Sequence, residues 1–84
     1  MTYRVDLAHP AQKALKALDG SIRSRIVTAL RALADEPRPS GCIKLTNRDA
    51  WRIRVGDYRI VYEIHDRLLV VTVIDLGHRR DIYR

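Results

Sequence analysis

Three arginines flank a tight turn in the second half of the chain and could hold a phosphate group together. Arg52 and Arg54 precede the dipeptide Gly56-Asp57, and Arg59 follows it, within two runs that alternate apolar and polar residues. Such runs, joined by two residues with glycine first, predict a β-hairpin with a type II′ turn. Arginine binds phosphate through a planar fork of N–H groups, so the cluster predicts recognition of a phosphodiester.

The two-residue turn predicts which residues face one another across the hairpin. Arg54 falls opposite Arg59, and Arg52 falls opposite Val61. These three arginines form what we call the arginine face. Like charges directly opposite destabilise a sheet by roughly 0.2–1 kcal/mol, so we expect an anion over them. The alternative is a solvated polar surface with splayed side chains. The other face is expected to pack on the core with Trp51, Ile53, Val55, Tyr58, Ile60 and Tyr62.

The last segment of the chain adds further groups suited to RNA. His78, Arg79, Arg80 and Tyr83 follow an apolar strand that should return antiparallel beside Arg59, which brings them near the arginine face. Arginine contacts phosphate, tyrosine stacks on a base, and histidine titrates near neutral pH. Together these groups suffice for cleavage of RNA by its own 2′-hydroxyl, in which one group accepts a proton and cations stabilise the developing charge.

Glu63 is the one carboxylate expected beside the arginines. It either pairs with Arg52, which is favoured, or accepts a proton. Tyr58 and Tyr62 are expected to pack in the core, and His65 is expected to be solvated.

The remaining residues predict the elements that position this hairpin. Residues 3–7 alternate as a strand, two apolar stripes predict helices after Pro10 and around Ile26, and residues 42–45 form a short strand. Residues 68–76 are almost continuously apolar, as in a central strand covered on both faces. The sequence predicts a single α+β domain spanning residues 1–84. Its order is β-α-α-β-β-β-β, with a twisted, largely antiparallel sheet and a helical hairpin packed on one face.

Composition narrows the class of protein. The net charge is +6, and thirteen of the sixteen basic residues are arginine. A GC-rich genome is the alternative explanation for that total, so the positions of the arginines carry the argument. A single cysteine, Cys42, excludes an internal disulfide and a cysteine-rich metal site. No leader and no membrane-spanning run is visible, so we expect a cytoplasmic protein without membrane contact.

Two stretches resemble the RelE/ParE toxin superfamily. They are WRIRVGDYRIVYE at 51–63 and LGHRRDIYR at 76–84, in order and at the right separation. The resemblance covers essentially the whole chain, leans towards RelE, and implies the RelE-like microbial RNase fold.

RelE toxins of this kind cut mRNA in the ribosomal A site without a metal or other cofactor, and so inhibit translation. A cognate acidic antitoxin neutralises them, and the pair contacts operator DNA through the antitoxin. The resemblance assigns RNA binding and catalysis to Arg52, Arg54, Arg59, His78, Arg79 and Tyr83, with Arg80 as a further RNA contact.

This chain departs from typical members at two positions. They carry lysine where it has Arg52 and Arg54, and arginine is a poor proton acceptor because it stays charged. His78 or Glu63 could replace the lysines as proton acceptor, or positioning and electrostatics could carry most of the rate. Two other functions stay open: a ParE-like inhibitor of DNA gyrase without chemistry of its own, and a degenerate relative that binds antitoxin and operator DNA.

Overall fold

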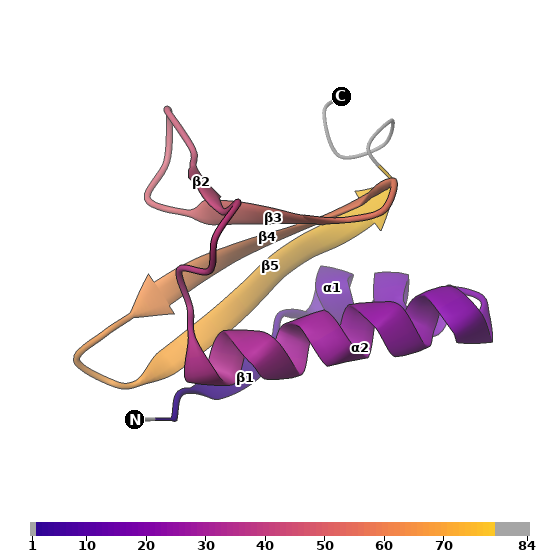
Figure 1. The fold of residues 1–84 in the computed structure, drawn as a ribbon, viewed down its shortest axis with the longest axis horizontal. Helices are drawn as coiled ribbons and strands as arrows, with labels where there is room; N and C mark the ends of the chain where they lie inside the picture. Colours follow the sequence, from indigo (N-terminus) through magenta and orange to yellow (C-terminus); the bar gives the residue numbers. More distant parts are fainter. Residues whose placement is uncertain (1, 79–84) are drawn as a thin grey trace.

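The chain folds with two helices between the first strand and four later strands (Figure 1). The computed structural model describes residues 2–78. The elements are β1 (Arg4–Leu7), α1 (His9–Lys16), α2 (Gly20–Asp35), β2 (Ile43–Lys44), β3 (Trp51–Val55), β4 (Tyr58–His65) and β5 (Val70–His78). The predicted order β-α-α-β-β-β-β is confirmed.

The five strands form one sheet in the order β1-β5-β4-β3-β2. β1 runs parallel to β5, and the other neighbouring strands are antiparallel, so the expected largely antiparallel α+β sheet is confirmed. Both helices lie on the same side of the sheet (Figure 1). No helix of residues 2–78 covers the other side.

Local signals account for where the helices begin. Pro10 lies in the first turn of α1, where its missing N–H is not needed. The N-cap of α2 is Asp19, and Ser21 lies inside the first turn of the helix. The Arg23 guanidinium donates a 2.6 Å hydrogen bond to the carbonyl of Leu18, just beyond the end of α1. Within the described residues, neither helix is long and apolar enough to span a membrane.

The core lies between the helices and one face of the sheet. Three residues of the apolar stripe of α2 are buried there, as its spacing predicts, and so are Ile53, Ile60 and Tyr62 of the hairpin. The other apolar residues of that face of the hairpin are partly buried against this core. The largest fully buried side chains are Tyr62, Ile26, Leu33, Ile60, Val71 and Val73. The apolar face of the hairpin therefore packs on the core, and its polar face points away from the helices.

β5 differs from the sequence expectation in its bounds and its surroundings. The apolar run predicted a strand over 68–76 covered on both faces, but β5 is Val70–His78 and packs on the helices with one face. A turn occupies residues 66–69, where Leu69 has a φ of +54° and the Leu68 N–H donates to the His65 carbonyl. Leu68 is consequently 72% exposed. Hydrophobicity alone does not show where the turn ends and the strand begins.

Candidate functional site

The β3–β4 hairpin has the predicted register. Arg54 pairs with Arg59, and Arg52 pairs with Val61, on the side of the sheet away from the helices. Gly56 in the turn has a φ of +60°, a conformation that glycine adopts without strain. Because successive side chains of a β-strand point to opposite faces of the sheet, the arginines lie on one face and their sequence neighbours on the core face.

The three arginines differ in exposure. Arg59, on the inner strand of the hairpin, is 8% exposed. Arg52 is half-buried, and Arg54 is exposed. The alternative of side chains splayed into solvent therefore fits Arg54 alone. Three guanidinium groups on two adjacent strands create a local positive potential that attracts phosphate.

β5 extends this surface across a third strand. Gly77 pairs with Arg59, so β5 presents no side chain beside that arginine, and Asp75 pairs with Val61. The surface therefore has two rows across β3, β4 and β5: Arg54, Arg59 and Gly77 in one, and Arg52, Val61 and Asp75 in the other.

A β-bulge in β5 brings Asp75 to this side of the sheet. Consecutive residues of β4 pair with Val73 and Asp75, so Ile74 is an extra residue in β5. Val73 and Leu76, three positions apart, are 0% and 2% exposed and both face the core. Unbroken alternation would have turned Asp75 toward the helices and Leu76 outward. The bulge avoids burying a carboxylate in the apolar core, which is costly.

Glu63 lies on the same side of β4 but is engaged elsewhere. Its carboxylate is 3.3 Å from Nε2 of His65, and no ion pair in the described part of the chain joins it to Arg52. The favoured Glu63–Arg52 pair is therefore wrong. His65 is exposed, as expected. The expectation of a single carboxylate beside the arginines is also wrong, because the exposed Asp75 lies there too.

His78, the last residue of β5, lies on the opposite side of the sheet from the arginine face. It pairs with Tyr58, and the two rings meet edge to face with centroids 5.6 Å apart and planes at 78°. The expectation that His78 lies near the arginines is wrong, because Gly77 takes the outward position there. Arg79, Arg80 and Tyr83 lie outside the described residues, and their roles stay predictions.

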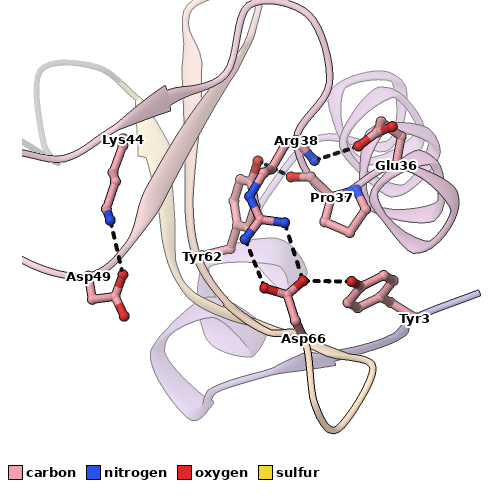
Figure 2. A network of polar contacts seen from close by, with 8 residues as sticks. All are labelled: Tyr3, Glu36, Pro37, Arg38, Lys44, Asp49, Tyr62 and Asp66. Carbon is pink, nitrogen blue, oxygen red and sulfur yellow. Dashed lines mark hydrogen bonds and ion pairs between the residues drawn. The ribbon is translucent and has the colours of Figure 1, made fainter.

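Asp66, in the β4–β5 turn, joins distant parts of the chain (Figure 2). Its carboxylate accepts a 2.6 Å hydrogen bond from the Tyr3 hydroxyl and bonds of 3.2 and 2.9 Å from Nη1 and Nη2 of Arg38. The Arg38 guanidinium, and then the Tyr3 hydroxyl, hold the pKa of Asp66 at about 2, below its usual 3.8. The hydrogen bond to Asp66 also raises the pKa of Tyr3. The N-terminal segment and the loop after α2 are thereby tied to this turn.

The loop after α2 also braces the arginine hairpin. The Arg38 guanidinium carbon lies 5.2 Å from the centroid of the Trp51 ring, and Nζ of Lys44 lies 5.9 Å from it. The buried Tyr62 hydroxyl donates a 2.7 Å hydrogen bond to the Pro37 carbonyl (Figure 2). Burial raises the pKa of Tyr62. These contacts hold β3 and β4, and so the arginines they carry, against the rest of the fold.

A groove of about 560 Å³ runs between α2 and the outer edge of β3. β4 pairs with one edge of Ile53–Val55, but β2 pairs only with the first two residues of β3, so within residues 2–78 the outer edge of Ile53–Val55 has no strand beside it. The lining is mainly apolar, with two arginines at its margin: Ala29, Ala32, Leu33, Pro39, Ser40, Gly41, Ile43, Arg52, Ile53, Arg54 and Val55. Such a groove suits a peptide segment with both apolar and acidic side chains.

Comparison with known protein families identifies the family to which this chain belongs. The family model of the ParE toxin of the type II toxin-antitoxin system, parDE, matches residues 5–83, which include the hairpin and most of the last segment. The chain belongs to the RelE/ParE superfamily of type II toxins.

Individual relatives extend this result to the fold. The toxin is 28% identical over 87 residues to a RelE-like toxin protein of Escherichia coli, covering 99% of the toxin and 92% of the relative. A chain of the archaeal RelE–RelB complex from Pyrococcus horikoshii is 32% identical, with a TM-score of 0.84 and coverage of 96% and 99%. A chain of the RelBE2 toxin-antitoxin complex from Mycobacterium tuberculosis is 26% identical, with a TM-score of 0.85 and coverage of 96% and 95%. The RelE-like fold is thereby confirmed.

Sequence reasoning missed two features of the toxin's site. Asp75 was missed because the bulge reverses the alternation of β5. Its signal was a charged residue two positions after Val73, where a regular strand would face the core. The contacts around Asp66 join residues 3, 38 and 66, and no local pattern reveals contacts over such separations.

Proposed function

We propose that the toxin cleaves mRNA in the ribosomal A site and thereby inhibits translation. The observation that best supports this is Arg54 directly opposite Arg59, with Arg52 one row away. Two guanidinium groups that face each other across adjacent strands can bind one phosphate together. The alignment with RelE chains over nearly the full length supports the same reaction class.

In this reaction the 2′-oxygen of the mRNA attacks the adjacent phosphorus and the bond to the 5′-oxygen breaks. Arg52, Arg54 and Arg59 would orient the phosphate and stabilise the negative charge that develops on its oxygens. Their role is electrostatic, because a guanidinium keeps its protons at neutral pH. Arg79 and Arg80 would add phosphate contacts, and Tyr83 would stack on a base. The proposed chemistry draws on side chains alone and uses no cofactor.

An acidic antitoxin is the proposed partner of the toxin when the toxin is neutralised and translation proceeds. The groove between α2 and β3 offers apolar walls and an open strand edge, with Arg52 and Arg54 at its margin. A segment that folds on binding could fill it with apolar side chains and pair its carboxylates with the arginines. We further propose that the toxin acts in the cytoplasm and reaches operator DNA through the antitoxin.

Purified toxin mixed with ribosomes that hold a defined mRNA in the A site tests the proposed activity. We expect a cut in the A-site codon, and no cut in the same mRNA without ribosomes. A reaction in which the ribosome-bound mRNA stays intact contradicts the proposal.

The matching family model names ParE, and this favours inhibition of DNA gyrase as the second candidate. In that case the toxin would act through protein contacts and carry out no chemistry itself. Gyrase assays on the same preparation separate the two functions: trapped cleavage complexes together with intact mRNA would support the ParE-like activity.

A further inference from the structure

An exposed carboxylate stands on the same side of the sheet as the arginine face, at a position set by a break in strand regularity. Asp75 lies in the row of Arg52 and Val61, and it is the diagonal neighbour of Arg59 across β4 and β5. Diagonal neighbours in a sheet have side chains about 7–8 Å apart, within the span of one bound nucleotide's phosphate and ribose. No hydrogen bond or ion pair joins Asp75 to another residue of 2–78.

The reaction proposed above requires a proton acceptor, and the described residues narrow the choice. The three arginines cannot serve, because they hold their protons. His78 lies on the opposite side of the sheet, against Tyr58. Glu63 is 3.3 Å from His65 and lies one row further from the hairpin turn than Asp75, opposite Thr72.

We propose that Asp75 accepts the proton of the attacking 2′-hydroxyl. This inference rests on the proposed RNA cleavage. The bulge at Ile74 supports it, because bulges commonly re-aim a side chain beside an active site. The cost of burying a charge explains why the Asp75 carboxylate points outward. That cost does not explain why the apolar strand β5 carries a carboxylate, whereas a role in proton transfer explains it.

The cleavage step needs no reactant other than the mRNA and water. The proton of the 2′-hydroxyl moves to the Asp75 carboxylate as the 2′-oxygen forms its bond to phosphorus. The bond from phosphorus to the 5′-oxygen breaks, and that oxygen takes a proton from water. The products are a 2′,3′-cyclic phosphate and a free 5′-hydroxyl, and Asp75 returns its proton to solvent.

Single-turnover cleavage of ribosome-bound mRNA, followed from pH 5 to 8, tests this role. We expect Asp75→Asn to lower the rate by about 100-fold or more, the usual contribution of a positioned base. We expect Asp75→His to restore part of the rate and to lose it again below about pH 6.5, where imidazole becomes protonated. A side chain with a purely structural or electrostatic role would not transfer its own titration to the reaction. Asp35→Asn, the same change at an exposed position at the end of α2, is the control and should cleave like the wild type.

The outcomes separate the two proposals. Wild-type cleavage that Asp75→Asn changes by less than about 3-fold overturns this inference and leaves the proposed function standing. A large loss in Glu63→Gln with normal Asp75→Asn also overturns it and moves the role to Glu63. Wild-type toxin that leaves the mRNA intact overturns both. Circular dichroism of each variant verifies that the fold is retained.

Discussion

Arg59 differs from the other two arginines in that its side chain is buried. It is 8% exposed on an inner strand, whereas Arg54 stands exposed opposite it. A buried, pre-positioned cation stabilises developing charge without having to reorganise.

Arg59→Ala should lower ribosome-dependent cleavage by about 100-fold or more, the scale seen when one positioned donor to an oxyanion is removed. Arg67→Ala removes the same charge from the exposed β4–β5 turn and should leave cleavage unchanged. Single-turnover cleavage rates of the two variants test this prediction, and their melting temperatures show whether each variant remains folded. Equal activity in Arg59→Ala and wild type would remove Arg59 from the site.

At the scale of single residues, the sequence predicted the positions of the hairpin arginines well and those of the candidate proton acceptors poorly. The two-residue turn determines the pairing of Arg54 with Arg59, so alternation alone was sufficient. Asp75 and His78 follow a bulge, which moves each to the side opposite from that expected of a regular strand. Residues on the far side of an irregularity cannot be assigned to a face by counting.

Among the elements, the turn between β4 and β5 is the junction on which the hairpin depends. Asp66 in that turn binds Arg38, and Arg38 lies over Trp51, the residue that begins β3. The order of helices and strands followed from apolar periodicity, but this junction did not, because it joins side chains from segments distant in sequence. The end of the apolar run at Leu68 was likewise invisible to hydropathy, since turn and strand are both apolar there.

The lowered pKa of Asp66 predicts an acid-dependent loss of stability. Its folded-state pKa of about 2 lies below the usual 3.8, so the carboxylate contacts stabilise the fold above about pH 4 and are lost as the pH falls toward 2. Urea unfolding should therefore show wild type more stable than Asp66→Asn at pH 7. The difference should shrink between about pH 4 and pH 2. A difference that stays constant over this range would show that the carboxylate charge contributes nothing.

The whole molecule carries a net charge of +6. Both helices lie on one side of the sheet (Figure 1). Strand alternation places the arginine face on the other side. Electrostatic attraction accelerates association with an acidic partner and weakens steeply with ionic strength.

We expect the association rate constant of toxin and antitoxin to fall about tenfold or more between low and high salt. Arg54→Ala should lower the rate at low salt more than Lys13→Ala, since both side chains are exposed but Lys13 lies on α1. Stopped-flow mixing measures both rates. Equal effects of the two variants would show that net charge alone, and not the arginine face, guides the antitoxin.

Expression of the toxin without its antitoxin, followed by mapping of the cut ends of cellular mRNA, tests whether the toxin cleaves mRNA on the ribosome. We expect growth arrest and cuts at a fixed position within in-frame codons, both lost in Arg59→Ala. Growth arrest with intact mRNA, unchanged in Arg59→Ala, would contradict mRNA cleavage by the toxin and point to gyrase as the target.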